Sequence, residues 1–517
     1  MALLLCESIK MALILNLPIL KENPVIVAET RPQKISLYLT SLRAQNPQEL
    51  ASYLLSELST LNRQKVSPTN RIQALDTYRP MLINTCHALA EHYSDAALPL
   101  HSQEKAAASA AESLWLELGY GYKLALVDLQ NQLFKIGNNT AHCIQHAMHA
   151  IAEQALVYYQ TYVTPPSHLW GDLHQLYFCA VQLGVQNQTL LDIDQQTTIE
   201  NTYVHALLMS LADTQHLSQQ NIRLAATFLA NHLKDAHISA VAPLESTAGA
   251  FVIDLKSNQP PVAFSKRQTF PDPATDILLL TIDLVRALHL QLSNLQNNQL
   301  VSATRENEID LLTYLIMHWG ITPKRLFRRL PKNGDLELVT GIADIQQVSN
   351  PNMAINQPEG KQIKPILPSR WQILNISASG MSIRRHPTAE KNIRIGSLVG
   401  IKTKNEAQWS LAVVRWANCK SRDKLDIGLE LIAPQTDCAT ASIAAPTADQ
   451  QGRNETVLLV PENTATKQTA SIIVPRGTYA TARQLTLKHK NEIQYALLTK
   501  LIDRTQHFEQ VQYSVIE

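Results

Sequence analysis

Apolar residues recur at intervals of three and four positions through most of the region between residues 35 and 320, which predicts amphipathic helices. The stretch that follows Gln45 shows the pattern with its start signal, because Asn46 is a cap residue, Pro47 fits the first helical position and Glu49 the third. Five further helices are expected over 102–134, 165–185, 219–236, 273–295 and 306–320. One interruption, 250–264, has the residue pattern of a β-hairpin. We therefore expect an extended segment over 1–34 and an all-α domain over 35–320.

The hydrophobic pattern changes near Pro323 from helical spacing to short alternating runs rich in β-branched residues. Such runs, separated by turn residues, predict an antiparallel β module over 322–433. A polar stretch inside it, 346–369, is expected to be a loop insertion. An Ala- and Thr-rich segment, 434–454, is expected to be a linker, and a small barrel or sandwich should occupy 455–517. The predicted fold class is therefore multi-domain, with an all-α N-terminal region followed by two small β domains.

The overall charge argues against a nucleic acid as partner. The 517 residues carry 45 basic and 44 acidic side chains, so a chain-wide affinity for polyanions is not expected. The C-terminal β domain is nearly balanced in charge and has few aromatic residues, which are Tyr479, Tyr495, Phe508 and Tyr513. A groove for single strands needs both positive charge and stacking platforms, and this domain offers neither in quantity.

The cysteines and the N-terminus indicate a cytoplasmic protein. The six cysteines are scattered without CxxC or zinc-finger spacing, which is typical of buried free thiols in a reducing compartment. The apolar start is interrupted by Glu7 and Lys10, so we expect neither a signal peptide nor a membrane span. Met11 is an alternative initiator to Met1.

Two short motifs in the central β module contain side chains that can bind a phosphate group and a nucleotide base. The first, KRLFRR, contains Lys324, Arg325, Arg328 and Arg329, with the second and last forming an RxxxR pair. A guanidinium is a planar fork of donors that matches phosphate oxygens and the O6/N7 edge of guanine. Alone, such a run is equally consistent with a solvated basic arm.

The second motif is Asn375-x-Ser377-x-x-Gly380. Asn375 and Ser377 have the same parity on a strand and should face one side of the sheet. An amide both donates to and accepts from a base edge, and a hydroxyl does either. Gly380 permits a positive φ or a close backbone approach to a ligand. The same residues are also ordinary turn formers, so the motif alone leaves an unspecialised strand–turn–strand open.

The order of these motifs, followed by VVRW and DIGLEL, resembles the PilZ domain family over about residues 322–433. The resemblance implies a six-stranded antiparallel barrel that binds the second messenger cyclic di-GMP. It further implies that Arg325 and Arg329 clamp the ligand, with Lys324 and Arg328 as accessory contacts. Asn375 and Ser377 would contact a guanine edge, and Gly380 would keep the turn open. The sequence departs from the family in the spacing of the motifs, since 45 residues separate Arg329 from Asn375, and in the absence of an obvious helix after the barrel.

A histidine cluster offers the main alternative to a nucleotide-binding site, because it could bind a metal. His142, His146 and His149 share one face of a predicted helix, with Cys143 beside them, and such spacing can ligate zinc. No HExxH glutamate and no nearby carboxylate accompanies them, so we expect a packing or surface role and no metal. No catalytic constellation is evident. Several aromatic residues are expected to pack between helices: Trp115, Tyr120, Tyr122, Trp170 and Tyr177.

Taken together, the sequence predicts a cyclic di-GMP receptor that is not an enzyme and needs no cofactor. Ligand binding would order the arm around Arg325 and Arg329 and thereby alter the preceding helix, 306–320. The helical region would engage an unidentified protein partner. Two alternatives remain at this point. One is a PilZ-like scaffold that binds proteins without nucleotide, and the other is a metal-dependent enzyme using the His142 cluster.

Overall fold

We analysed a computed structural model of the full chain. It describes the following residues: 13–42, 45–131, 138–192, 195–297, 303–321, 327–349, 366–387, 392–404, 406–421, 424–443, 453–462, 469–490 and 492–516.

The chain divides into two compact units. The first, the helical unit, comprises Met1–Ala96 and Leu100–Lys324. The second, the β unit, comprises Arg325–Glu517 together with Ala97–Pro99, in which Leu98 forms an antiparallel bridge with Ile393. No described helix is long and apolar enough to cross a membrane.

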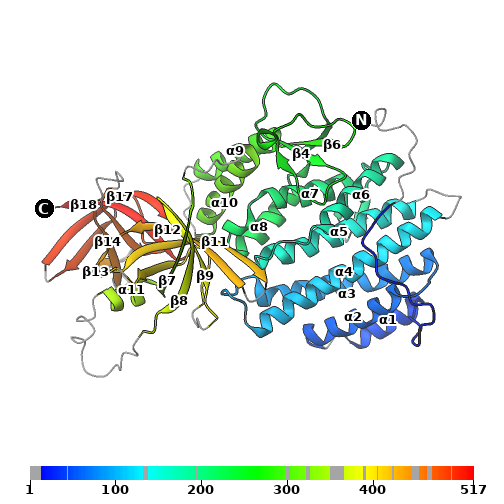
Figure 1. The fold of residues 1–517 in the computed structure, drawn as a ribbon, viewed down its shortest axis with the longest axis horizontal. Helices are drawn as coiled ribbons and strands as arrows, with labels where there is room; N and C mark the ends of the chain where they lie inside the picture. Colours follow the sequence, from blue (N-terminus) through cyan, green and yellow to red (C-terminus); the bar gives the residue numbers. More distant parts are fainter. Residues whose placement is uncertain are drawn as a thin grey trace. The chain divides into compact units, whose positions relative to one another are not determined.

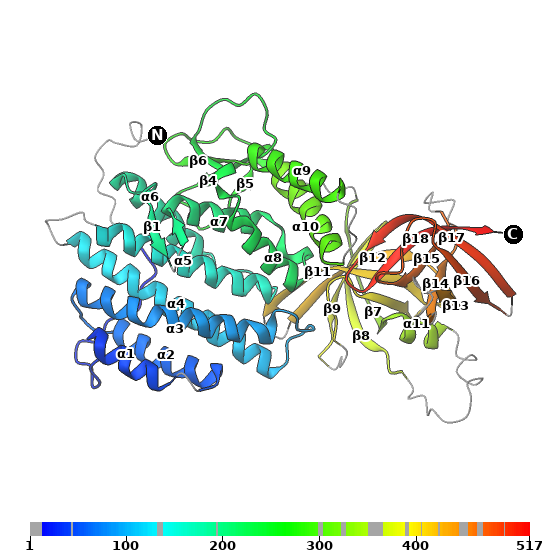
Figure 2. The same cartoon turned by 180° about the vertical axis from the view of Figure 1, so that it is seen from behind.

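The helical unit is built from helices arranged around α4, with α3 and α5 packed on either side of it (Figures 1 and 2). Its helices are α1 (Pro32–Ser41), α2 (Pro47–Asn62), α3 (Pro68–Tyr93), α4 (Ser102–Asn131), α5 (Asn138–Gln160), α6 (His168–Leu183), α7 (Ile199–Leu211), α8 (Gln219–Ala230), α9 (Ile282–Asn297) and α10 (Ala303–Gly320). A two-stranded hairpin, β1 (Leu190–Asp192) and β2 (Gln195–Thr197), precedes α7.

Local signals explain where these helices begin and end. The Asn46 side chain accepts a hydrogen bond from the Glu49 amide at 3.0 Å, which confirms the predicted start of α2. The buried residues of that helix follow the predicted stripe, at Ala51, Leu54, Leu58 and Leu61. At the other end of a helix, α6 stops at Gly184, whose φ of 69° is the left-handed conformation that glycine adopts most easily. The expectation that aromatic residues pack between helices is confirmed for Trp115, Tyr122, Trp170 and Tyr177, which are all buried.

The helical unit also contains a four-stranded sheet, so the prediction of an all-α region needs a correction. The sheet has the order β3-β6-β4-β5, with β3 (His237–Ala240), β4 (Ala250–Asp254), β5 (Val262–Ala263) and β6 (Asp276–Leu280). The predicted hairpin is present as β4 and β5. The helix predicted over 273–295 begins only at Ile282, because the preceding residues form β6 in the middle of the sheet. A run of consecutive apolar residues fits a buried strand as well as a helix, and periodicity cannot separate the two.

The first β domain is a closed antiparallel barrel of six strands, as predicted. The strands follow the order β10-β11-β12-β9-β8-β7 around the barrel. They are β7 (Leu330–Thr340), β8 (Ser369–Ser377), β9 (Gly380–Arg385), β10 (Leu398–Thr403), β11 (Ser410–Ser421) and β12 (Lys424–Ala433). One row of paired residues fills the interior, namely Ile373, Ile383, Ile427 and Ala417, each at most 2% exposed.

The second β domain is a barrel rather than a sandwich, and it too has six antiparallel strands. They are β13 (Asp437–Ile443), β14 (Arg453–Val460), β15 (Ser471–Pro475), β16 (Gln484–His489), β17 (Glu492–Arg504) and β18 (Phe508–Ile516). The first of them lies inside the predicted linker 434–454, which is a second correction. Its buried residues are small. Ala439 and Ala441 lie in the core of the second barrel, and Cys438, on the opposite face, lies in a buried cluster with residues of the first barrel. The segment therefore lacks the bulky residues by which strands are usually recognised.

The two barrels share a hydrophobic core. Val339 and Val413 of the first barrel lie in one buried cluster with Leu458 and Phe508 of the second. A short helix, α11 (Ile342–Ser349), contributes Ile345 to the same cluster. This helix overlaps the start of the stretch 346–369, which we had expected to be a loop insertion throughout. The remainder of that stretch up to residue 365 lies outside the described residues.

An ion-pair network fastens the two barrels beside this core. The Arg415 guanidinium of β11 contacts Glu430 of β12 at 2.5 Å and Asp503 of β17 at 2.6 Å. Burial opposes the charge on Arg415, but the two carboxylates outweigh it and raise the pKa of this side chain. The β unit therefore consists of two barrels joined by a buried hydrophobic cluster and an ion-pair network.

Candidate functional site

The structure places the described members of the two predicted motifs at one end of the first barrel. Arg328 and Arg329 are exposed and directly precede β7. Asn375 and Ser377 belong to the last part of β8, and Gly380 begins β9. Lys324 and Arg325 lie outside the described residues.

A row of paired residues crosses the outer face of this barrel. It consists of Pro331, Asn375, Ser382, Gly428 and Trp416, on strands β7, β8, β9, β12 and β11. This row faces outward, because residues next to it in the chain, such as Ile383 and Ile427, point into the barrel. The register shifts between Ile373 and Asn375. That irregularity brings Asn375 onto the outer face, although simple alternation would place it inside with Ile373.

Trp416 and Arg329 are stacked on this outer face. The Trp416 indole covers Gly428 so closely that any β-carbon at position 428 would overlap the ring. The Arg329 guanidinium lies 5.7 Å from the centre of that ring, which is a cation–π contact. Two residues after Arg329, Pro331 pairs with Asn375. The arginine arm therefore passes directly beside the row that joins Asn375 to Trp416.

Asn375 presents an unused hydrogen-bond acceptor. Its side-chain Oδ1 is buried and has no hydrogen-bond partner among the described residues. A buried amide oxygen without a partner costs about 1–3 kcal/mol, so such atoms are uncommon away from ligand sites. The same is true of Asn418 Oδ1, on β11 two residues beyond Trp416.

Ser377 and Gly380 shape the turn between β8 and β9. The Ser377 hydroxyl donates to the Gly380 carbonyl at 3.2 Å and so closes the two-residue turn. Gly380 is not among the glycines with positive φ. A β-carbon at this position would instead overlap the Leu429 carbonyl oxygen of β12. The close approach seen here is to the backbone of β12, and the approach to a ligand stays a prediction.

Most of the charge further along this face is already neutralised. Arg384 of β9 makes a two-pronged ion pair with Asp426 of β12, with distances of 2.6 and 2.8 Å. The hydrogen bonds to Asp426 raise the pKa of Arg384. Arg328 and Arg329, beside Asn375, are thus the cations best placed to meet an anionic ligand.

This arrangement suits a ligand with a flat base and a phosphate. The arginine and the indole provide stacking surfaces, and the amide oxygen accepts from a base edge. Sequence reasoning found the arginines and Asn375 but missed Trp416. The VVRW segment was noted only as a strand, and its tryptophan becomes significant once the register places it across from Gly428.

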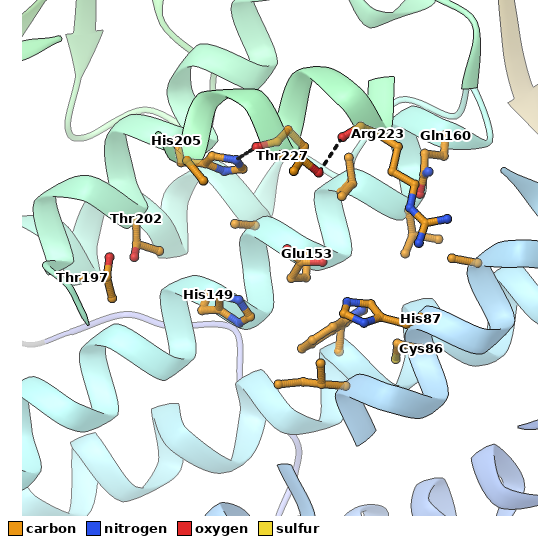
Figure 3. Close-up of a pocket in the computed structure, with 18 of the residues that line it drawn as sticks. Cys86, His87, His149, Glu153, Gln160, Thr197, Thr202, His205, Arg223 and Thr227 are labelled. Atoms are coloured by element: carbon orange, nitrogen blue, oxygen red, sulfur yellow. Dashed lines mark hydrogen bonds between the residues drawn. The ribbon is translucent and has the colours of Figure 1, made fainter. Parts of the chain in front are cut away.

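A separate cavity of about 500 Å³ lies within the helical unit (Figure 3). His87 of α3, His149 and Glu153 of α5, and Arg223 of α8 lie around it. Burial, followed by the charge of Arg223, lowers the pKa of His87. Gln145 also lines the cavity, donates to the Thr202 hydroxyl at 2.7 Å and is 1% exposed. None of the described residues of the two predicted motifs lines this cavity.

The histidine cluster is divided by the structure. His149 lies at the cavity, with its ring edge-on to Trp115. His142 and His146 instead face each other, with ring centres 4.1 Å apart, and meet Asp76 of α3. The expectation that no carboxylate accompanies these histidines is therefore wrong, because Asp76 is 66 positions away in the sequence but 2.9 Å from His142 Nε2.

Comparison with known proteins gives a consistent family assignment along the whole chain. Residues 33–243 match the family described as the N-terminal domain of the cyclic-di-GMP receptor FimW. Residues 250–347 and 343–437 match the middle PilZ domain of that receptor, and residues 439–516 match its C-terminal β-barrel domain. The cyclic-di-GMP receptor FimW of Pseudomonas aeruginosa is 23% identical, over 97% of this chain and 93% of that protein. The chain therefore carries a PilZ domain, which contains the closed six-stranded barrel.

Proposed function

We propose that this protein is a receptor for cyclic di-GMP. The observation that carries the proposal is the outer wall of the first barrel, where Arg329 lies on Trp416 beside the unpaired Oδ1 of Asn375. The similarity to proteins described as cyclic-di-GMP receptors supports the same conclusion. Neither the scaffold nor the metal-dependent enzyme is supported by these findings. We therefore infer a binding protein rather than an enzyme.

Each part of the ligand has a partner in this proposal. Cyclic di-GMP presents guanine bases and phosphates, and the guanidinium groups of Arg325 and Arg329 would contact both, with Lys324 and Arg328 as accessory contacts. Asn375 Oδ1 would accept from the donor edge of a guanine, which would give that buried oxygen its missing partner. The Ser377 oxygen can also accept, since its proton is used in the turn. Trp416 offers an aromatic face against which a base can stack.

Replacement of Arg329 by alanine should weaken binding of cyclic di-GMP at least tenfold. The change removes charge-assisted contacts worth roughly 1.5–3 kcal/mol. Arg329 is exposed and outside the barrel core, so the melting temperature should change by less than about 2 °C. Calorimetric titration of the full chain with cyclic di-GMP measures the affinity, and calorimetric unfolding measures the stability.

Arg370→Ala is the matched control for this measurement. Arg370 is likewise exposed and lies on β8, but at the opposite end of the strand from Asn375. It should bind cyclic di-GMP as the wild type does. Wild-type affinity in the Arg329 variant would refute the assignment of the site, and no binding to the wild-type chain would refute the proposed function.

The arm offers a direct route from ligand to helix, because only residues 321–324 separate the end of α10 from Arg325. We propose that ligand binding orders the arm and that α10 passes the change to a protein partner of the helical unit. Cyclic di-GMP should then slow amide hydrogen exchange in 327–330 and 375–381 and alter it in 306–320, with 102–131 unchanged. Four Gly/Ser residues inserted after Gly320 should preserve affinity and abolish the response in 306–320. A response that survives the insertion would exclude this route.

A cytoplasmic location belongs to the same proposal. Five cysteines lie in the described residues, and all five are buried. Burial raises the pKa of Cys86 and Cys143, which keeps them as unreactive thiols. Buried thiols of this kind are typical of a reducing compartment.

A further inference from the structure

The helical unit carries a cluster of metal-ligand type that the proposed function does not use. Asp76 of α3 meets His142 and His146 of α5, and the three ligand atoms lie within 4.8 Å of one another. His142 Nε2 is 2.9 Å from Asp76 Oδ1 and 3.1 Å from Oδ2. The two histidines are four positions apart on one helix, which places both rings on the same face. The three helices involved, α3, α4 and α5, pack side by side (Figure 1).

A second observation is that hydrogen bonding within the protein leaves one ring nitrogen of this cluster unsatisfied. His146 is 5% exposed, and its Nδ1 has no hydrogen-bond partner among the described residues. A buried ring nitrogen without a partner is costly unless something binds to it.

The Asp76 carboxylate is held in a fixed orientation that suits cation binding. The Tyr122 hydroxyl donates to Asp76 Oδ1 at 2.7 Å and fixes the orientation of the group. Outer hydrogen bonds of this kind accompany most metal-binding carboxylates. Asp76 is thus an oriented anion at the centre of the cluster.

We propose that Asp76, His142 and His146 form a binding site for a divalent transition metal, with zinc as the best fit. Two imidazoles and one carboxylate favour this class of ion over Mg²⁺ or Ca²⁺, which prefer oxygen ligands alone. Zinc bonds of about 2.0–2.2 Å in a tetrahedron require ligand atoms about 3.3 Å apart, so only small movements from the observed spacing are needed. Cys143 is not part of the site, because it is fully buried and burial raises the pKa of its thiol. The bound metal would join α3 to α5.

A charge of the same sign as the metal is that of Arg79, which lies on α3 three positions after Asp76. It weakens attraction for a cation, and the Asp76 carboxylate counters it. We therefore expect a site that fills at micromolar zinc rather than one that retains metal through chelation. This expectation sets the range in which the titration must be performed.

The test is metal uptake by the full chain, stripped with a chelator and titrated with Zn²⁺ and, separately, Co²⁺. Wild-type protein should bind one ion per chain, with the visible absorption of tetrahedral Co²⁺ and a raised melting temperature in Zn²⁺. His142→Ala and Asp76→Asn should lose this uptake by at least roughly 100-fold. Both positions are partly exposed, with side chains 30% and 41% accessible, so the variants should fold. His92→Ala, an exposed histidine also on α3, should bind as the wild type does.

Tyr122→Phe separates orientation of the ligand from packing. It keeps the buried ring but removes the hydrogen bond to Asp76, and metal affinity should fall about tenfold. Absence of uptake by the wild type would overturn the proposal. Equal uptake by the wild type and His142→Ala would overturn it as well, because the ion would then be held elsewhere. Neither result bears on cyclic di-GMP binding, which rests on the β unit.

Discussion

Asp172→Ala should destabilise the helical unit by about 3–5 kcal/mol, measured by urea unfolding at pH 7. Asp172 of α6 pairs with Lys123 of α4 at 2.6 Å, and both side chains are 3% exposed. Removing the carboxylate leaves a buried ammonium group without its counter-charge. Breaking a buried pair on one side is costly for this reason, even where the intact pair contributes little.

The same pair also holds the N-terminal segment in place. The backbone N–H of Asn16 donates to Asp172 Oδ1 at 2.9 Å, and Lys123 Nζ donates to the backbone carbonyl of Asn16 at 2.7 Å. The variant therefore loses one anchor of that segment together with the ion pair. Faster amide exchange of Asn16 should accompany the loss of stability.

The pH dependence of the Asp172→Ala variant follows from Lys123. Burial lowers the pKa of Lys123, while Asp172 acts to raise it. Without Asp172 the folded-state pKa falls further below the unfolded value of about 10.4. Between those two values the unfolded state binds the extra proton, so stability rises with pH. The difference in unfolding free energy between the wild type and the Asp172→Ala variant should therefore shrink by at least about 1 kcal/mol between pH 7 and pH 9.5.

A double variant provides the control for this prediction. Lys123→Met with Asp172→Leu replaces the pair by apolar side chains of similar size and should be within about 1–2 kcal/mol of the wild type. If Asp172→Ala were as stable as the wild type, or if its loss of stability did not change with pH, the role assigned to the Lys123–Asp172 ion pair would be wrong.

The parts of the fold that could be predicted from the sequence are those determined by residues close together in the chain. The start of α2 follows from Asn46 and Glu49, three residues apart, and its buried stripe from spacings of three and four. The first barrel follows from alternation within each strand. These signals are local, and the structure reproduces them.

The errors arose where local pattern is ambiguous. The apolar run of β6 fits a strand or a helix, and only its position between β3 and β4 decides. Strand β13 buries small residues such as Ala439 and Ala441, which are also common in linkers. The second half of α11 lies within the polar stretch 346–369, whose pattern predicts a loop. The helix became evident only from its packing against both barrels.

The candidate sites show a different limit. The arginines and Asn375 belong to recognisable motifs, but Trp416 joins them through the register of four strands. Asp76 joins His142 across 66 positions of sequence, through the packing of two helices. Such pairs depend on long-range geometry, for which a single sequence has no signal.

Gly380→Ala should destabilise the β unit by roughly 3–5 kcal/mol, because the added methyl group meets backbone rather than a side chain. The β-carbon would overlap the Leu429 carbonyl oxygen, and Gly380 itself pairs with Glu430 of the same strand, β12. A side chain could rotate away, but here β9 and β12 must separate. That separation would break ladder hydrogen bonds at the turn where Ser377 and Asn375 lie.

The effect should extend through both barrels. They share one buried cluster, which includes Leu411 and Val413 of the first barrel and Ile473 and Phe508 of the second. Urea unfolding followed by far-UV circular dichroism should therefore show a single β-unit transition shifted to lower urea, with an unchanged slope. Cyclic di-GMP affinity should fall at the same time, because the site is built on the displaced strands.

Gly334→Ala is the matched control, on β7 of the same barrel. A β-carbon there would find its nearest neighbour, Ile373 Cδ1, at 3.7 Å, which is an ordinary contact. This variant should lie within about 1 kcal/mol of the wild type and keep its affinity. If Gly380→Ala were equally harmless, β9 and β12 could not approach as closely as the structure indicates. The glycine of the NxSxxG motif would then serve the ligand directly rather than the spacing of the strands.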